Sequence, residues 1–472
     1  MKRLLFVFFL SVALFSNLYA GGLMTNTNYH IAFDRMFARG ATSEIDAIYS
    51  NPAGLAWGHE GWQFSLNFQK PWQNRDITTT YPMFQQMYGD ATHEFEGKAS
   101  VPIVPALFAS YKKDRWSLAA MIGIVGSGGF VKYEEGIPMF NVMTMGKIYQ
   151  QTATLPTGPI TPDMYTIDSN VKGKQYIYGG QLNFAYKILD CLSAAVGLRA
   201  NYYDGYSRGF VTATTKPELG GIQLMDLNLN VIQRGWGFTP ILSVDYHKGP
   251  LTVGVKYEFR TKISTDNNTK ALNVTMNGQT TDILAMANQY GNEATLQAIA
   301  ASMGQGMADK IKDFMPNEKV RYDMPALLTA AVQYEFTPKL RAALEYHFFD
   351  DKHAKMANDR QKELTHGTHE FLAGVEYDIN KTFTVSLGGQ RTDYGLSEGY
   401  QSNTSFACDS YSIGAGTAIN LNERLRLNVS YFCSLYSDYT VESSNYLGTG
   451  LSGKDVYSRT NHVIGLGIDY KF

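Results

Sequence analysis

Apolar and polar side chains alternate along almost the whole chain after residue 58, and this pattern limits the possible folds more than any other feature. Successive side chains of a strand point to opposite faces, so the alternation predicts strands with one apolar face each. The clearest series are Trp62, Phe64, Leu66 and Phe68; Trp116, Leu118, Ala120 and Ile122; Leu340, Ala342, Leu344 and Tyr346; and Ile464, Leu466, Ile468, Tyr470 and Phe472.

Two kinds of connection separate these strands, and they take turns along the chain. Short turns are predicted at Lys112–Arg115, Leu189–Asp190, Lys248–Pro250, Thr337–Lys339, Asn380–Thr382 and Asn420–Glu423. Longer, more polar segments lie between them, near residues 71–100, 127–173, 205–228, 262–320, 351–367, 395–404 and 438–457. Six short turns join six pairs of strands, and the first and last strands complete a set of 14.

An even strand number, with short turns at one end and long loops at the other, is typical of a membrane barrel. We therefore predict an all-β fold, a 14-stranded antiparallel transmembrane β-barrel, over residues 59–472. Mean hydropathy is only −0.22 although 13% of residues are aromatic, which fits a wall that is apolar at alternate positions. A helical membrane protein needs apolar runs of about 20 residues, and none follows residue 20. The alternative is a soluble β-sandwich, which does not predict this asymmetry of the loops.

The first 20 residues have the features of a secretory signal peptide. Lys2 and Arg3 precede an apolar stretch from Leu4 to Phe15, and Leu18-Tyr19-Ala20 offers a cleavage site before Gly21. The apolar stretch is too short to cross a bilayer as a helix. We therefore expect export, and we expect the mature barrel to lie in the outer membrane of a Gram-negative cell.

Residues 21–58 precede the first strand and do not alternate. A polar, partly helical segment of this kind can hang in the periplasm or fold back into the barrel as a plug. Fourteen strands enclose a lumen wider than the wall's own side chains fill, which favours a plug unless the pore is open.

Three blocks of sequence resemble one known family. The segment Ala47-Ile48-Tyr49-Ser50-Asn51-Pro52-Ala53-Gly54-Leu55 resembles the N-terminal plug signature of the outer-membrane transporters of long-chain fatty acids and aromatic hydrocarbons. Tyr111–Leu118 resembles the first periplasmic hairpin of that family, and Gly235–Gly237 with Ile241–Tyr246 resembles a strand in the middle of its barrel. The resemblance spans residues 21–472 and implies the same strand number.

The resemblance also implies a function, the passive uptake of a hydrophobic small molecule, with long-chain fatty acids as the expected ligands. The ligand enters an apolar groove of extracellular loops, moves to a pocket in the lumen, and leaves sideways beside a kinked third strand. This path suits an apolar molecule because it avoids a water-filled pore. The predicted plug and gate residues are Asn51, Pro52, Ala53, Gly54 and Leu55. Asn51 and Pro52 couple the plug to the wall or, in the alternative that we favour for these two side chains, only shape the entry into the first strand.

The sequence offers candidates for the groove and for the kink. Apolar residues at helical spacing in the loop at 262–320 indicate helices that bind ligand or that pack on each other as a lid. The candidate ligand-binding residues are Ile283, Leu284, Met286, Ala287, Leu296, Ile299 and Met303, with Phe130, Phe140 and Met143 from the loop at 127–173. For the kink we predict Gly123, Gly126, Gly128 and Gly129, whose alternative role is to mark where the strand enters its loop.

Signals for enzymes and for nucleic-acid binding are missing from the sequence. His366 and His369 form the closest histidine pair, and on a strand their spacing points them to opposite faces. The net charge of −2 provides no basic field for nucleic acid. We expect no catalytic residue, no metal and no cofactor. The expected partners are a fatty acid-like small molecule, outer-membrane lipids and, during biogenesis, the barrel-assembly machinery, and we expect a monomer.

Two other functions remain alternatives. A surface receptor that binds haem or another hydrophobic ligand through its loops would have the same barrel. An outer-membrane lipid hydrolase would need a Ser/His or Asp/His set at one rim, and none stands out. The transporter is the leading prediction.

Overall fold

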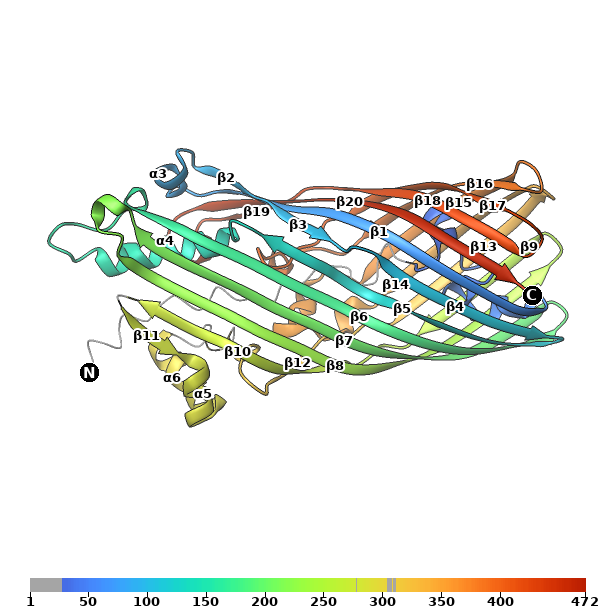
Figure 1. The fold of residues 1–472 in the computed structure, drawn as a ribbon, viewed down its shortest axis with the longest axis horizontal. Helices are drawn as coiled ribbons and strands as arrows, with labels where there is room; N and C mark the ends of the chain where they lie inside the picture. Colours follow the sequence, from blue (N-terminus) through green and yellow to red (C-terminus); the bar gives the residue numbers. More distant parts are fainter. Residues whose placement is uncertain (1–27, 277, 304–307, 309–310) are drawn as a thin grey trace.

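The chain forms a closed antiparallel β-barrel in the computed structural model, which describes residues 28–276, 278–303, 308 and 311–472. The predicted signal peptide at 1–20 and the first residues of the predicted plug, 21–27, lie outside this range. The C-terminus and the short connections lie at one end, called here the turn end (Figure 1). The loop helices lie at the other, the loop end.

Fourteen strands build the wall, as predicted, and irregularities divide four of them. In chain order they are β1 (Gly61–Thr80); β2, β3 and β4 (Thr92–Phe95, Gly97–Ser100, Val104–Lys113); β5 (Trp116–Tyr133); β6 (Tyr165–Leu189); β7 (Leu192–Thr215); β8 (Gln223–Lys248); β9 and β10 (Leu251–Glu258, Ser264–Met276); β12 and β13 (Lys319–Arg321, Leu327–Thr337); β14 (Leu340–Phe349); β15 (Thr368–Asp378); β16 (Phe383–Asp393); β17 (Ser410–Asn420); β18 and β19 (Leu425–Tyr436, Tyr439–Ser443); and β20 (Gly453–Lys471). A short strand, β11 (Gln279–Asp282), pairs back onto the end of β10.

The barrel closes where β1 pairs with β20, in an unbroken register from Gln63↔Lys471 to Thr80↔Lys454. All six predicted short turns are present, and they connect β4–β5, β6–β7, β8–β9, β13–β14, β15–β16 and β17–β18. The prediction of long loops was partly wrong, because β6, β7 and β8 continue well into the segments 127–173 and 205–228. Beyond the apolar band the outward residues become polar, so the hydropathy pattern ends although the backbone ladder continues.

Helices occur in the lumen and at the loop end. In the lumen are α1 (Ile31–Met36), α2 (Ala47–Ser50) and the 3-10 helix η2 (Pro52–Trp57). At the loop end are α3 (Phe84–Tyr88), α4 (Pro138–Thr152), α5 (Ile283–Tyr290) and α6 (Asn292–Met303). Short 3-10 turns occur at η3 (Pro162–Met164), η4 (Pro217–Leu219), η5 (Asp351–His353), η6 (Ala357–Glu363), η7 (Glu398–Tyr400) and η8 (Tyr446–Gly448). Among the described residues, no helix is both long and apolar enough to cross a membrane.

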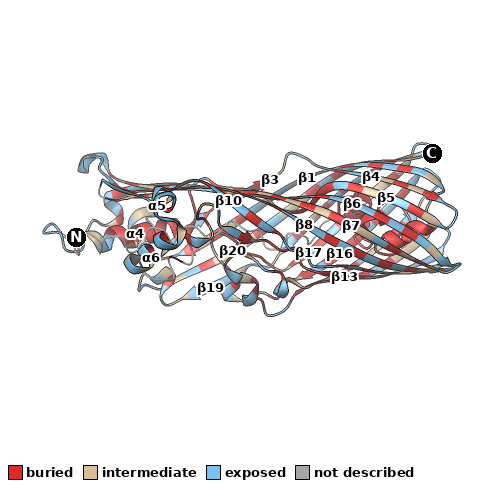
Figure 2. Cartoon of the chain, turned by 90° about the horizontal axis from the view of Figure 1, so that it is seen from below, coloured by how far each residue is buried: buried red, intermediate tan, exposed pale blue. Residues whose placement is uncertain are grey.

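The outer surface of the wall is an apolar band with aromatic edges. Buried and exposed residues alternate along the strands (Figure 2). On β6, Tyr186 marks the band's edge at the turn end and Tyr176 its edge towards the loop end, and Leu182 between them is 65% exposed. Lys174 follows immediately beyond Tyr176 on the same face. This is the surface of a barrel that spans a bilayer.

Candidate functional site

The described N-terminal residues, 28–58, called here the plug, lie inside the barrel towards the turn end. Buried ion pairs hold the plug to one side of the wall. Arg35 Nη1 lies 2.7 Å from Glu376 Oε1, and Arg39 Nη1 lies 3.5 Å from Glu376 Oε2. The backbone N–H groups of Arg39 and Gly40 both donate to Glu345 Oε2 at 2.6 Å. The plug is therefore anchored to β14 and β15 by charged contacts that leave few of its polar groups without partners.

Three wall glycines let the plug backbone approach this side closely. Gly374, Gly388 and Gly414 lie directly opposite one another on β15, β16 and β17. A Cβ atom on Gly388 would lie 2.1 Å from the Met36 carbonyl oxygen, and one on Gly374 would lie 2.0 Å from it. Because no side chain tolerates such a distance, this row of glycines is the seat for the end of α1.

The five predicted gate residues lie where the plug meets β7 and β8. Asn51 Nδ2 donates to Asp245 Oδ2 at 3.1 Å, and Asn51 is fully buried. Pro52 begins η2, and Ala53, Gly54 and Leu55 continue it, all of them buried. The Ala53 N–H donates to Ser243 Oγ at 3.0 Å. The motif thus joins the plug to the wall, and its role as a gate remains a prediction.

The wall is interrupted between its second strand and β5. Register pairs run from Lys113↔Trp116 to Ala106↔Gly123 and resume at Ala99↔Val131. Among the described residues, 100–105 and 124–130 have no partner across this seam. The second strand contributes Pro102 and Pro105, which lack the N–H group that a ladder needs. We call this stretch the open seam.

The same stretch of β5 is irregular on its other side, against β6. One extra residue, Val125, lies between the pairs of Ile124 and Gly126, and another, Gly128, lies between those of Ser127 and Gly129. Gly129 has a φ of 73°, a conformation that favours glycine. Two bulges in one strand bend it, so Gly126, Gly128 and Gly129 lie where β5 departs from a regular strand, whereas Gly123 is still in register with both of its neighbours. Their role in an exit remains a prediction.

An apolar cluster lines the lumen beside the open seam. Val125 and Ile177 from the wall are fully buried in one cluster with Ile48 and Tyr49 of the plug and Phe108 of β4. The plug therefore turns an apolar face towards β5 and a charged face towards β14 and β15.

The loops at the loop end form a second apolar cluster, which joins α4, α5 and α6. Of the predicted ligand-binding residues, those buried in this cluster are Phe140, Met143, Ile283, Ala287 and Ile299, and Leu284 and Leu296 pack against it. Met286 is half-buried, and Phe130 faces outward on β5, opposite Lys174. Met303 ends α6, and its side chain is outside the described part. The buried candidates thus pack against one another across the loop helices, as expected for a lid. Ligand binding by these residues remains a prediction.

One cation lies within this apolar region, and sequence reasoning missed it. Lys147 of α4 is 2% exposed. Among the described residues it has no hydrogen bond or ion pair, and burial lowers its pKa to about 8. Thr144, one helical turn before it, is also buried, and its Oγ1 has no hydrogen-bond partner within the part of the chain that the structure describes. Residues three apart share a helix face, so α4 presents two buried donors on one side.

The turn end of the lumen is charged, in contrast to the apolar cluster of the loop end. A cavity of about 740 Å³ lies there between the plug and the short turns. Its charged lining residues are Arg39, Glu44, Glu335, Lys339, Arg341, Asp378, Lys381 and Arg426. Burial alone would raise the pKa of Glu44, but the guanidinium groups of Arg426 and Arg39 hold that pKa well below its usual range. The carboxylate therefore stays charged at neutral pH.

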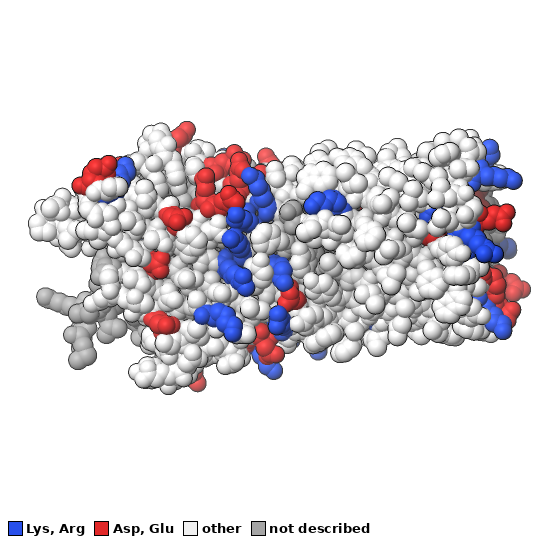
Figure 3. Space-filling view, viewed as in Figure 1, with Lys and Arg blue, Asp and Glu red and all other residues white. Residues whose placement is uncertain are grey.

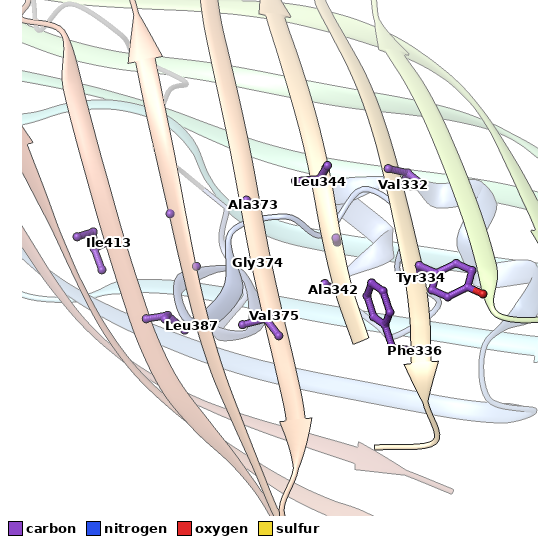
Figure 4. Close-up of a pocket in the computed structure, with 13 residues that line it drawn as sticks. Val332, Tyr334, Phe336, Ala342, Leu344, Ala373, Gly374, Val375, Leu387 and Ile413 are labelled. Atoms are coloured by element: carbon purple, nitrogen blue, oxygen red, sulfur yellow. The ribbon is translucent and has the colours of Figure 1, made fainter. Parts of the chain in front are cut away.

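Two further hollows lie on the outside of the wall and not in the lumen. One, of about 660 Å³, is lined by outward residues such as Val332, Leu344 and Ile413 around the small Ala373 (Figure 4). The other, of about 810 Å³, adjoins it. Because their apolar side chains point away from the plug, lipid acyl chains are the natural occupants.

The described residues contain no group of three or more His, Cys, Asp and Glu side chains that could hold a metal ion. His369 instead contacts Tyr346, whose hydroxyl lies 2.7 Å from its Nδ1.

No known family model and no curated protein matches the sequence. Solved structures match it over nearly its full length. A Pseudomonas aeruginosa FadL homologue has 13% identity and a TM-score of 0.63, covering 95% of this chain and 99% of that chain. The Pseudomonas putida toluene transporter TodX has 12% identity and a TM-score of 0.56, covering 97% and 100%. The Ralstonia pickettii toluene transporter TbuX has 14% identity and a TM-score of 0.50, covering 96% and 100%. At this identity the likeness establishes the barrel fold, as the sequence resemblance predicted.

Proposed function

We propose that this chain is an outer-membrane transporter for the passive uptake of hydrophobic small molecules, and that its substrates are long-chain fatty acids. The loop end faces the outside of the cell and the turn end faces the periplasm, as short turns do in such barrels. The ligand enters between the loop helices, reaches the apolar cluster beside the plug, and leaves through the open seam into the bilayer.

The open seam is the observation that carries this proposal. A gap in a barrel wall leaves backbone groups unpaired, which is costly in hydrocarbon, so it needs a purpose. Here the gap adjoins the apolar cluster of Val125, Ile177 and Phe108. An apolar ligand can move from that cluster to lipid without crossing water.

Lys147 favours a ligand with a carboxylate over a plain hydrocarbon. A buried ammonium group without a partner is costly, and a carboxylate placed beside it offsets that cost. The lone hydroxyl of Thr144 on the same helix face offers a second donor. Two of the similar structures are toluene transporters, and toluene is an apolar molecule, which supports an apolar ligand in general.

Uptake in cells tests the proposal. Gram-negative cells that lack their own fatty acid uptake barrel are given this chain and a radiolabelled long-chain fatty acid. The proposal expects uptake well above that of cells given an empty vector. Uptake equal to the empty vector, with the folded barrel present in the outer membrane, contradicts it.

Binding to the purified protein tests the carboxylate. The variant Lys147→Met should lose about 10-fold in affinity for a fluorescent fatty acid, the usual size of a charged hydrogen bond. Affinity for a hydrocarbon of equal length should not change. Equal losses for both ligands would show that the substitution only disturbs packing.

The pH dependence of binding gives an independent check. Carboxylate binding requires the ammonium form, and the Lys147 pKa is about 8 before ligand binds. Fatty acid affinity should therefore be constant from about pH 6, where the fatty acid itself is ionised, to about pH 8, and fall as pH rises further. The hydrocarbon control, and the variant Lys147→Met with the fatty acid, should show no such fall.

A further inference from the structure

Four cations lie side by side on the outer face of the barrel, on four neighbouring strands. The register pairs Lys98 of β3 with Lys132 of β5, Lys132 with Lys172 of β6, and Lys172 with Arg208 of β7. Figure 3 shows basic side chains crossing this face between the barrel wall and the loops. We call these four residues the basic row. Like charges directly opposite each other destabilise a sheet, so the row favours a bound anion.

Carboxylates of the chain neutralise only part of the row. Lys98 Nζ lies 3.2 Å from Glu96 Oε2, and Lys132 pairs with Glu134. The first pair is exposed to solvent, and in the second Glu134 is exposed while Lys132 is half-buried, so these surface pairs contribute little. For Lys172 and Arg208, the described residues provide no carboxylate within 4 Å, and Arg208 Nε donates to Asn230 Oδ1 at 3.0 Å.

The residues next to the row towards the turn end add further charge and an aromatic surface. Tyr206 lies between two cations, with Lys174 Nζ 5.5 Å and the Arg208 guanidinium carbon 4.4 Å from its ring centre. Asp204 is shared by Lys174 and Arg234, whose Nε lies 3.0 Å from Asp204 Oδ1. One carboxylate thus serves two cations, and this group of three side chains keeps one positive charge in excess.

The depth of the row points to the kind of anion. The aromatic edge of the apolar band, formed by Tyr176, Tyr178, Tyr202 and Trp236, lies immediately on the turn side of these residues. Leu182, Val196 and Phe238 follow on the wall and are 56% to 65% exposed. Aromatic edges lie at the depth of lipid headgroups, so the basic row faces the headgroup layer of the leaflet on the loop side.

We propose that the basic row binds the phosphate groups of a phosphorylated glycolipid of the outer leaflet, whose acyl chains lie on the apolar wall of β5–β8. Charge complementarity and the continuity of the row with the apolar band identify a lipid as the occupant. Phosphate oxygens accept strong hydrogen bonds from Lys and Arg. The inference rests on the outer-membrane placement in the proposed function, but it concerns the outer surface and not the transport path.

Lipid binding to the purified full chain in detergent tests the proposal, with bisphosphorylated lipid A as the probe. The variant Lys98→Gln/Lys132→Gln/Lys172→Gln/Arg208→Gln should bind it about 10-fold or more weakly than the unchanged chain. The matched control Lys113→Gln/Lys248→Gln/Lys381→Gln/Arg424→Gln removes four exposed cations at the turn end and should bind normally. Lipid A without its phosphates should bind the unchanged chain as weakly as bisphosphorylated lipid A binds the basic-row variant.

Three results would overturn the inference. They are normal binding of lipid A by the basic-row variant, equal binding of the dephosphorylated lipid, and binding of inorganic phosphate as tight as that of the lipid. Fatty acid uptake by the same variant separates this inference from the proposed function. Retained uptake, together with the loss of lipid A binding, supports a separate lipid site and shows that the variant folds. A variant that loses both would contradict a separate site.

Discussion

Two regions beside the plug, the charged cavity at the turn end and the open seam in the wall, differ in chemical character. At the turn end, the 740 Å³ cavity beside the plug is lined by charged groups, including Arg39, Glu44 and Arg426. At the open seam, the neighbouring residues are apolar, and Val125 and Ile177 are fully buried beside the plug. An apolar molecule loses free energy when it enters a charged, hydrated cavity and gains it on passing to hydrocarbon.

The plug contacts the wall in different ways beside these two regions. Ion pairs and backbone hydrogen bonds hold its charged side to Glu345 and Glu376. Its other side meets β5 through apolar contacts, which are not directional. Hydrogen bonds also reach this side, because the Ile48 carbonyl oxygen accepts from Gln181 Nε2 at 2.8 Å and the Tyr49 carbonyl oxygen accepts from Lys256 Nζ at 2.9 Å. Under the proposed function, we predict that a ligand shifts the side of the plug that faces β5 while the side held by Glu345 and Glu376 stays in place. The predictions below test this contrast, from the largest expected effect to the smallest.

Straightening β5 along β6 should disturb the proposed lateral exit. Deleting Val125 and Gly128 together takes away the two extra residues and leaves a strand in continuous register with β6. Fatty acid uptake by cells should fall to the level of the empty vector. Deleting Lys270, the extra residue in the pairing of β10 with β8, is the matched control and should leave uptake unchanged. Normal uptake by the double deletion would exclude the open seam as the route.

Removing the ion pairs that hold the charged side of the plug should lower stability strongly and leave fatty acid uptake unchanged. Glu376→Gln removes the charge that faces Arg35, Arg39 and Arg341, and breaking buried pairs of this kind costs about 3 kcal/mol or more. Urea unfolding in vesicles measures the loss, and planar bilayers should show a higher ion conductance. Glu335→Gln, an exposed residue of the same cavity, is the control. A parallel rise in fatty acid uptake would mean that the ligand leaves through the charged cavity.

A polar side chain beside the open seam should weaken the proposed lateral route, because it makes the seam less apolar. Val125→Asn places an amide in the apolar cluster, and an amide without hydrogen-bond partners there costs about 1–3 kcal/mol. Uptake should fall several-fold, because the ligand loses part of its apolar path. Ser43→Asn, a change of similar size in the charged cavity, should leave uptake as it is. Equal effects of the two substitutions would remove the contrast between the two regions.

The smallest effect is expected where the plug motif meets β8. Asn51→Ala removes one hydrogen bond to Asp245 and should lower the free energy of unfolding by about 1 kcal/mol. Uptake should stay normal if Asn51 only positions the plug. A clear loss of uptake without a matching loss of stability would instead identify Asn51 as part of the gate.

The sequence predicted the barrel well, because alternation and short turns are local signals. All six turns lie at the predicted places, and the closing series from Ile464 to Phe472 pairs with β1. Gly126, Gly128 and Gly129 of the irregular part of β5 are visible in the sequence, since glycine in a strand is an irregularity, and their role in an exit remains a prediction. Pro102 and Pro105 carried the same kind of signal on the opposite side of the open seam, and it was overlooked.

The seat of the plug and the buried lysine could not be predicted, because they depend on contacts between residues far apart in the sequence. Arg35 and Glu376 are 341 positions apart, and nothing near either residue indicates the pair. The row of Gly374, Gly388 and Gly414 becomes visible only once the register of three strands is known. Lys147 was missed because a lysine in a loop helix is usually exposed, and only the packed loops show that it is buried.

Photolabelling tests the lateral route most directly. A long-chain fatty acid with a diazirine at the end of its chain is bound to the protein in outer membranes and irradiated, and the labelled residues are identified by mass spectrometry. We predict labels on residues 101–105, on 124–130 and on Ile177, at the open seam. Labels on the lining of the charged cavity, such as Thr42 and Thr384, with none at the seam, would contradict the account.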